Sequence, residues 1–377
     1  MMKLCIIYVL QITYFMMCAI QPVSSTGSHR NGHLKPLGSH AAVKRPVKVL
    51  DGFPSPQEFY MDYVYSSVPV VFKDGARRSS AFSKWTDEYL MNLPESRETF
   101  VDVENKKVEN RSLDGTTMSF EDFVKQYKKL DSYLVTDVPD FLGKDIVVPP
   151  PLLCEPVLKT VVSMVMWFSS GGTKSVIHND DVENINCIFS GSKEFLFMNV
   201  TKYRNQIVFD HPEGSYMGTN VESVDFDKYP EFEDMEYYYA SASAGDCIYI
   251  PYKWIHQVNS IDRNIAVNLW FEHRTDLTPT SDSCGTISPD TTLADIEIYE
   301  PPEQVDDILT KVILFMLQSQ DGNEDNFIEF VNTLDDYQGM EWTNDALVAA
   351  KGFFKFADKD NDAQLTVQDV NLLKPVS

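Results

Sequence analysis

The sequence predicts a mainly β protein, with a double-sheet β-barrel core, helical additions and a small α-helical C-terminal domain. Many short apolar, aromatic or β-branched segments follow Pro151, and Gly, Ser, Asn and Asp separate them. No long helices alternate with these segments, which argues against an open parallel sheet. After Pro302, by contrast, apolar residues recur at helical spacing. Many short strands joined by turns are typical of a barrel of the jelly-roll type.

Length and charge limit the classes of function. The chain has 377 residues, enough for one large domain and a small second one. Its composition, 43% hydrophobic and 23% charged, is typical of a globular protein. The formal net charge of −24 would repel a polyanion, so no nucleic-acid partner is expected.

Residues 1–25 are predicted to be a signal peptide. Lys3 gives a positive start, residues 4–20 are largely apolar, and small residues follow around Ser24 and Ser25, where cleavage is expected. The alternative is an uncleaved membrane anchor, for which the stretch is near the lower length limit. The prediction is therefore a chain in the secretory pathway, either in the endoplasmic reticulum lumen or secreted. Membrane contact is expected only if the segment is uncleaved.

Glycosylation motifs and cysteines agree with that location. Asn110 and Asn199 each begin an Asn-x-Ser/Thr sequence. Four cysteines lie outside the predicted signal, and an oxidising compartment would permit any of three pairings among them. No Cys-x-x-Cys occurs, so neither a zinc site nor a thioredoxin-type site is indicated. These four are Cys154, Cys187, Cys247 and Cys284.

Along the chain, the segment 26–50 is basic and lacks apolar periodicity, which predicts a flexible linker. A globular domain is expected over 51–275, a polar linker over 276–300, and a helical domain over 301–377. Within the first domain, helices are predicted over 55–67, 80–93 and 119–127. Strands are predicted over 68–74, 132–138, 161–169, 184–190, 193–200, 246–251 and 264–272.

His178, Asp180 and His256 are candidate metal ligands. His178 and Asp180 are two residues apart, so on a strand both side chains point to one face, here the barrel interior. Two imidazoles and one carboxylate form the ligand set of a non-haem iron(II) oxygenase, which leaves positions open for a co-substrate and dioxygen. For an isolated His-x-Asp, the alternative is a buried histidine hydrogen-bonded to the aspartate.

Polar residues in apolar strands indicate where a co-substrate would bind. Lys193 shares a strand face with Phe195 and Phe197, and a buried ammonium needs an anionic partner, such as the distal carboxylate of 2-oxoglutarate. The alternative is a lysine whose head group reaches the surface. Ser175 would add a hydroxyl to the same carboxylate. Two asparagines in apolar surroundings, Asn184 and Asn268, also need hydrogen-bond partners.

The segments "GGTKSVIHNDDVENINCIFSGSKEFLFMNV" and "AGDCIYIPYKWIHQVNSIDRNIAVNLWF" resemble the JmjC, or cupin-like, 2-oxoglutarate oxygenases. Within that family they resemble the small hydroxylase branch typified by the asparaginyl hydroxylase of hypoxia-inducible factor. The resemblance spans 51–275 and implies a double-stranded β-helix core. It places the iron(II) ligands on His178, Asp180 and His256, and the 2-oxoglutarate contacts on Lys193, Ser175, Asn184 and Asn268. Ser175 stands where the family often has threonine.

The implied activity is oxidative decarboxylation of 2-oxoglutarate to succinate and CO2, coupled to hydroxylation of a C–H bond. The resemblance implies a protein substrate, and demethylation is the same chemistry on an N-methyl group. One alternative is an inactive JmjC or cupin binding module with a calcium-dependent partner. Another is a cupin enzyme that holds manganese or zinc.

Residues 358–369, "DKDNDAQLTVQD", resemble an EF-hand loop, which implies a calcium-binding C-terminal domain. Ala363 replaces the glycine of the sharp turn, and the last ligand is an aspartate rather than a glutamate. The alternative is a solvated acidic helix start. Residues 317–330 are a candidate ligand-poor partner loop. The candidate calcium ligands are Asp358, Asp360, Asp362, Gln364 and Asp369.

Overall fold

The computed structural model divides the chain into two compact units, Met1–Tyr299 and Glu300–Ser377. It describes residues 30–39, 44–105, 107–109, 115–203, 207, 209–210, 215–298, 322–330, 351, 353–355, 357–359, 362–366 and 369. The predicted signal peptide, Asn110 and Asp360 therefore lie outside the described residues. Among the residues described, no helix is both long and apolar enough to cross a bilayer.

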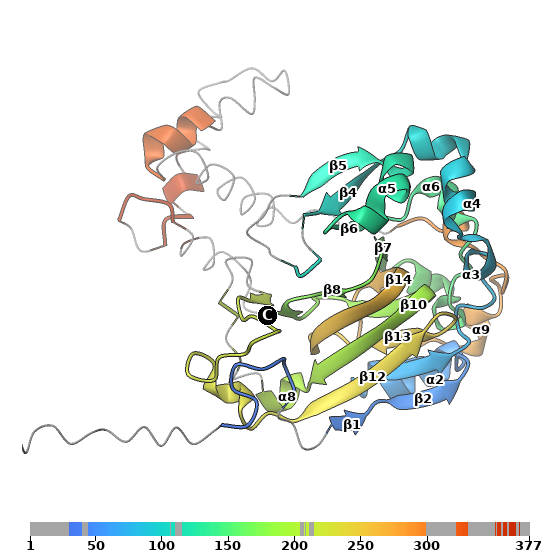
Figure 1. Ribbon diagram of the computed structural model, residues 1–377, viewed down its shortest axis with the longest axis horizontal. Helices are drawn as coiled ribbons and strands as arrows, with labels where there is room; N and C mark the ends of the chain where they lie inside the picture. Colours follow the sequence, from blue (N-terminus) through green and yellow to red (C-terminus); the bar gives the residue numbers. More distant parts are fainter. Residues whose placement is uncertain are drawn as a thin grey trace, which may run out of the picture. The chain divides into compact units, whose positions relative to one another are not determined.

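The first unit is built on two long antiparallel strands, β10 (Glu183–Met198) and β14 (Ile255–Phe271), which pair over most of their length (Figure 1). Each long strand changes its other neighbour about halfway. β10 pairs first with β13 (Cys247–Ile250) and then with β12 (Tyr237–Ser243). This change of partner wraps one hydrogen-bonded network into two layers, as in a double-stranded β-helix. The predicted mainly β, jelly-roll or cupin-type fold is confirmed.

The described strands form one 14-stranded network, whose main path runs β2-β3-β13-β10-β14-β7-β6-β4-β5. β1 with β12 and β2 with β3 pair in parallel, and the other named pairs are antiparallel. The remaining strands are β1 (Lys44–Pro46), β2 (Lys48–Asp51), β3 (Val70–Lys73), β4 (Phe100–Glu104), β5 (Thr116–Ser119), β6 (Tyr133–Asp137), β7 (Val161–Ser169), β8 (Thr173–Lys174), β9 (Ile177–His178) and β11 (Tyr216–Met217).

A bulge at Gly191 makes β10 one strand, where the sequence predicted two strands and a tight turn. Its φ is +74°, and a Cβ atom there would lie 2.4 Å from the carbonyl oxygen of Arg263. Glycine tolerates both the left-handed backbone and the close approach. At this point β14 carries the extra residues, because Asp262, Arg263 and Asn264 together face Gly191 alone, and the ladder between β10 and β14 continues on both sides.

Side-chain caps set where several helices begin. Ser55 forms a capping box at α2 (Pro56–Phe59), which continues as a π-helical turn, Tyr60–Val64. The helix predicted over 80–93 is two helices, α3 (Ala81–Lys84) and α4 (Asp87–Asn92), because Thr86 caps a new start.

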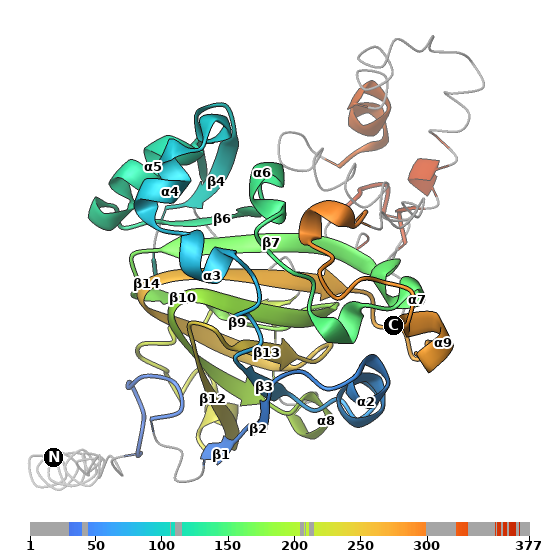
Figure 2. The same cartoon turned by 90° about the vertical axis from the view of Figure 1, so that its right-hand side faces the viewer.

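Ser119 caps α5 (Phe120–Gln126), which lies beside β4 and β5 (Figure 2). The other helices are α6 (Asp140–Gly143), α7 (Glu155–Leu158), α8 (Val200–Tyr203) and α9 (Ser281–Cys284). The 3-10 turns are Pro94–Arg97, Tyr127–Lys129, Pro150–Leu152, Pro230–Phe232 and Leu293–Asp295.

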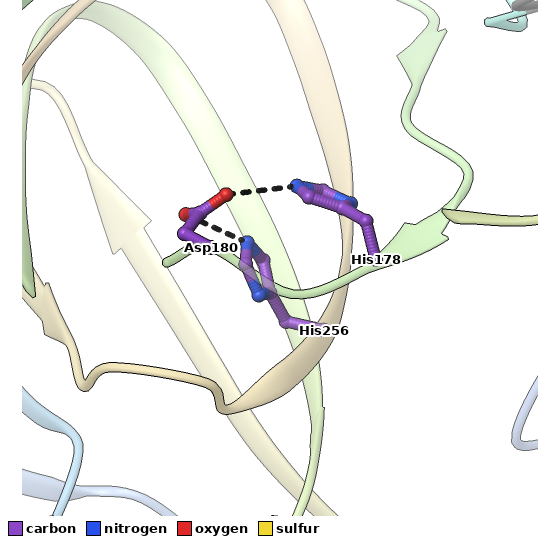
Figure 3. Close-up of side chains that lie close together, drawn as sticks. All are labelled: His178, Asp180 and His256. Carbon is purple, nitrogen blue, oxygen red and sulfur yellow. Dashed lines mark ion pairs between the residues drawn. The ribbon is translucent and has the colours of Figure 1, made fainter. Parts of the chain in front are cut away.

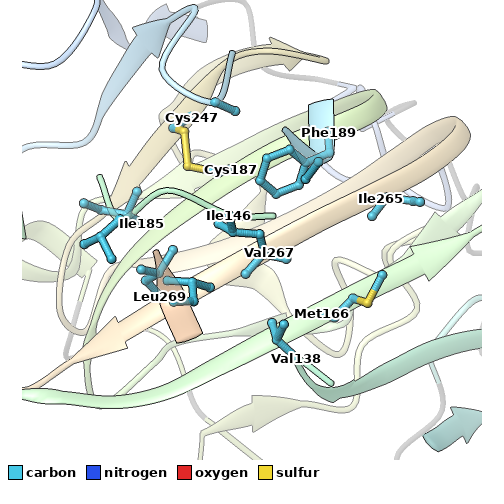
Figure 4. Packing of buried hydrophobic residues seen from close by; sticks show 14 of the residues in the cluster. Val138, Ile146, Met166, Ile185, Cys187, Phe189, Cys247, Ile265, Val267 and Leu269 are labelled. Carbon is cyan, nitrogen blue, oxygen red and sulfur yellow. A yellow bond between two sulfur atoms is a disulfide. The ribbon is translucent and has the colours of Figure 1, made fainter. Parts of the chain in front are cut away.

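The largest hydrophobic cluster lies against β7, β10 and β14, and Figure 4 shows Met166, Ile185 and Val267 packed within it. One disulfide, Cys187–Cys247, joins β10 to β13 inside this cluster, and a second, Cys154–Cys284, joins the start of α7 to α9. Of the three pairings that the sequence left open, the structure contains this one.

Both predicted linkers contain backbone pairing where they are described. β1 and all of β2 except Asp51 lie within the predicted linker 26–50, and these strands pair with β12 and β3. In the stretch 276–298, Cys284 is bonded to Cys154, and Thr292 forms a β-bridge with Val147. Main-chain pairing needs no apolar side chains, so composition alone did not reveal these contacts.

Candidate metal and co-substrate site

Two neighbouring strands and the loop after one of them bring the three predicted metal ligands together. His178 on β9 and His256 near the start of β14 are partners in the ladder, and Asp180 follows β9 by two residues (Figure 3). All three ligand atoms lie within 4.8 Å of one another. His178 Nε2 is 3.9 Å from Asp180 Oδ1, and His256 Nε2 is 3.8 Å from Asp180 Oδ2. These separations exceed hydrogen-bond length, so the groups converge without bonding one another.

Main-chain carbonyl groups fix the tautomer of both imidazoles. Nδ1 of His178 lies 2.9 Å from the oxygen of Val176, and Nδ1 of His256 lies 2.9 Å from the oxygen of Trp254. A carbonyl oxygen only accepts, so each Nδ1 carries hydrogen and each Nε2 presents a lone pair toward Asp180. Burial, together with repulsion from His178, lowers the pKa of His256 to about 4. His256 is therefore neutral at physiological pH, which is the form that binds a metal.

A chain of amides orients the aspartate. Asn184 Nδ2 donates to Asp180 Oδ2 at 3.2 Å, and Asn268 Nδ2 donates to Asn184 Oδ1 at 3.0 Å. Asn186 Nδ2 in turn donates to Asn268 Oδ1. The sequence singled out Asn184 and Asn268 but missed Asn186. Its position two residues after Asn184, on the same face of a strand, was the signal that could have identified it.

Lys193 lies buried in the same site, with 5% of its surface exposed. Its ammonium donates to Ser260 Oγ at 2.8 Å and lies 5.8 Å from the centre of the Trp167 ring. Burial lowers the pKa of Lys193 to about 7. Among the described residues, no carboxylate forms an ion pair with it. Sequence reasoning missed Ser260, although it lies four residues after His256 on the same strand face.

Ser175 lines the same cavity as the metal ligands and Lys193. Its hydroxyl oxygen accepts from the main-chain N–H of Val258 at 2.9 Å. The main chain of Ser175 also donates to the oxygen of Val258 at 2.9 Å, so β14 fixes the position of this residue.

One cavity is lined by all seven residues that the sequence assigned to metal and co-substrate. Tyr133, Trp167, Thr173 and Trp270 also line it. Three buried polar atoms in this lining, Trp167 Nε1, Trp270 Nε1 and Asn186 Oδ1, have no hydrogen-bond partner in the described part of the chain. Each such atom costs about 1–3 kcal/mol, so the cavity suits a polar ligand. The donor set therefore fits a divalent metal, and Lys193 fits an anion beside it.

Comparisons with known proteins agree with this geometry. The family model of the cupin-like domain matches residues 56–277. Lysine-specific demethylase 8 of Xenopus tropicalis is 24% identical over 229 residues, covering 58% of this chain and 51% of that protein. The human bifunctional peptidase and (3S)-lysyl hydroxylase JMJD7 is 24% identical over 278 residues, covering 62% of this chain and 87% of that protein.

The tRNA wybutosine-synthesizing protein 5 of Mus musculus is 25% identical over 317 residues, covering 74% of this chain and 98% of that protein. The chain thus spans about half of the first relative and most of the other two. The family model covers more than half of the chain, and the predicted resemblance to JmjC-type oxygenases is confirmed. This chain belongs to the cupin-like domain family, the JmjC-type 2-oxoglutarate oxygenases.

Proposed function

We propose that this chain is an iron(II)- and 2-oxoglutarate-dependent oxygenase that hydroxylates a protein side chain. The observation that carries the proposal is one cavity that contains both the His178–Asp180–His256 cluster and the buried ammonium of Lys193. A metal-binding scaffold without turnover would have no need for an unpaired cation in that cavity.

In this proposal, His178, Asp180 and His256 hold iron(II), while Lys193 and Ser260 hold the distal carboxylate of 2-oxoglutarate. When bound, this pair supplies oxidative decarboxylation with dioxygen, which gives succinate, CO2 and a hydroxylated C–H bond. Main-chain carbonyl groups hold both imidazoles with Nε2 toward the metal position, and Asn184 orients the aspartate. Trp167 and Trp270 line the same cavity, and in this proposal their rings shield the reacting centre from water.

A protein substrate is supported by two relatives, one named as a lysyl hydroxylase and one as a lysine-specific demethylase. A third relative is named for tRNA wybutosine synthesis. The net charge of −24 disfavours RNA for this chain and suits a basic protein segment. Mass spectrometry of proteins incubated with this enzyme should find a side chain with one added oxygen. Loss of a methyl group instead would favour demethylation.

The proposed location is the secretory pathway, with anchoring by residues 1–25 as the alternative. Two disulfides, Cys154–Cys284 and Cys187–Cys247, support an oxidising compartment. We further propose the domain limits 51–275 for the oxygenase and 301–377 for the helical domain. The segment 276–298 remains attached to the first unit through Cys284.

Calcium binding by the second unit also belongs to the proposal. Asp358 is buried, and its carboxylate accepts from the main-chain N–H groups of Asp362 and Ala363 at 3.2 and 3.0 Å. Ala363 has a φ of +65°, the left-handed conformation that glycine takes in an EF-hand loop. Gln364 forms a β-bridge with Asn323, in the candidate partner loop. Calorimetry should detect calcium binding in the wild type and its loss in Asp358→Ala. No heat in the wild type would remove this part of the proposal.

A further inference from the structure

Glu183, the first residue of β10, is a buried carboxylate outside the lining of the metal and co-substrate cavity. Only 1% of its surface is exposed. Three donors from separate segments meet it: the hydroxyl of Tyr249 at 2.5 Å, the main-chain N–H of Tyr252 at 2.9 Å, and Nδ1 of His273 at 2.6 Å. A buried carboxylate is costly unless its oxygens are hydrogen-bonded, so these three contacts stabilise it.

Tyr252 is held from two sides. Its main chain donates to Glu183, and its ring stacks on the ring of His273 with centroids 4.3 Å apart and planes 8° apart. Burial beside Glu183 raises the pKa of Tyr249 well above its usual value, so its hydroxyl stays protonated and remains a donor. Glu183 therefore joins β13, the turn 251–254 and the segment after β14.

The turn 251–254 contacts two of the three metal ligands. The main-chain N–H of Lys253 donates to the carbonyl oxygen of Asp180 at 2.9 Å. The carbonyl oxygen of Trp254 lies 2.9 Å from His256 Nδ1. Lys253 has a φ of +61°, a left-handed conformation that a residue with a side chain adopts only when its surroundings hold it there. The conformation of this turn therefore determines where Asp180 and His256 present their ligand atoms.

We propose that Glu183 is a positioning residue for the metal site, which acts by holding the turn 251–254 in its metal-binding conformation. The proposal rests on the metal site of the proposed function. It assigns Glu183 no contact with metal or substrate. Its effect passes through the N–H of Tyr252 to the turn, and from the turn to Asp180 and His256.

Cobalt(II) binding to the full-length protein tests this role, measured by calorimetry and by the visible absorption of the bound ion. Glu183→Gln keeps the size of the side chain but replaces one accepting oxygen with a donor. Asp145→Asn is a matched control, because Asp145 is 2% exposed and accepts from Ser80, Trp85 and Tyr89, away from the cavity lining. Both variants should have a lower Tm than the wild type. Only Glu183→Gln should bind cobalt(II) about tenfold or more weakly, with an altered spectrum.

Equal cobalt(II) affinity and spectrum in Glu183→Gln and the wild type would overturn the role and leave Glu183 as a residue of the fold. If Glu183→Gln does not fold, the variant His273→Phe tests the positioning role instead. This variant keeps an aromatic ring stacked on Tyr252 and removes one hydrogen-bond donor to Glu183. Weaker cobalt(II) binding in His273→Phe supports the role, and unchanged binding overturns it. A wild type that binds no cobalt(II) would overturn both the proposed function and this inference.

Discussion

Lys193 on β10 and Ser260 on β14 are opposite one another in the ladder, and the lysine ammonium donates to the serine hydroxyl at 2.8 Å. A hydroxyl satisfies one hydrogen of the ammonium without neutralising its charge. The same strand carries His256 four residues earlier, so cation and metal site share one wall of the cavity. This arrangement leaves the charge of Lys193 available to an anionic ligand.

Replacing Lys193 with alanine should weaken 2-oxoglutarate binding by about tenfold or more, since a charge-assisted hydrogen bond contributes about 1.5–3 kcal/mol. Calorimetry with manganese(II) in place of iron measures the Kd without turnover. Lys159→Ala is the control, because that side chain is 71% exposed. A Lys193→Ala variant with wild-type Kd would refute the assigned contact.

The affinity for 2-oxoglutarate should fall as pH rises above about 7. Burial lowers the pKa of Lys193 to about 7, so above that pH the empty site holds a neutral amine. A bound carboxylate favours the ammonium, so binding then takes up a proton, and Kd rises by up to about tenfold per pH unit. Lys193→Arg keeps its charge and should lose this dependence. A wild-type Kd that stays constant between about pH 6.5 and 8.5 would contradict the assignment.

Asn268→Leu should reduce both stability and metal affinity. The leucine would leave Asn184 Oδ1 and Asn186 Nδ2 without their partners in a buried site. The expected loss in the free energy of unfolding is about 1–3 kcal/mol, measured by urea denaturation. Asn92→Leu, at an exposed position at the end of α4, should change neither quantity appreciably. If Asn268→Leu and the wild type had the same free energy of unfolding, the hydrogen bonds from Asn268 to Asn184 and Asn186 would not contribute to stability as assigned.

The Cys154–Cys284 disulfide should contribute markedly to stability, because it joins residues 130 apart in the sequence. Removing such a bond typically costs about 2–5 kcal/mol. The Cys154→Ser/Cys284→Ser variant should therefore denature at lower urea concentration. Peptide mapping without reductant should recover both Cys154–Cys284 and Cys187–Cys247. Four free thiols in the protein purified from its native compartment would contradict both the pairing and the secretory location.

Short-range patterns predicted much of the site and the fold. The spacing of His178 and Asp180, and the apolar neighbours of Lys193, depend only on the two-residue period of a strand. Helix starts at Ser55 and Ser119 follow from local capping chemistry. These features need no knowledge of which strand pairs with which.

The features that were missed depend on pairing between distant segments. Ser260 reaches Lys193 only through the register of β10 and β14, and that register follows the bulge at Gly191. His273 follows the predicted strand 264–272 and was assigned no contact, yet it hydrogen-bonds to Glu183 across 90 residues of sequence. A sequence pattern that repeats every two residues does not predict contacts that depend on the register between two strands.

Succinate formation from 2-oxoglutarate, by the full-length protein with iron(II) and oxygen, tests the central claim most directly. The wild type should form succinate above background, stimulated by the true protein substrate. His178→Ala should form none above background, because it lacks one of the three converging ligands. Equal, background succinate from the wild type and His178→Ala, across a broad set of protein substrates, would contradict the proposed activity. That result would leave the chain as a binding module on an oxygenase fold.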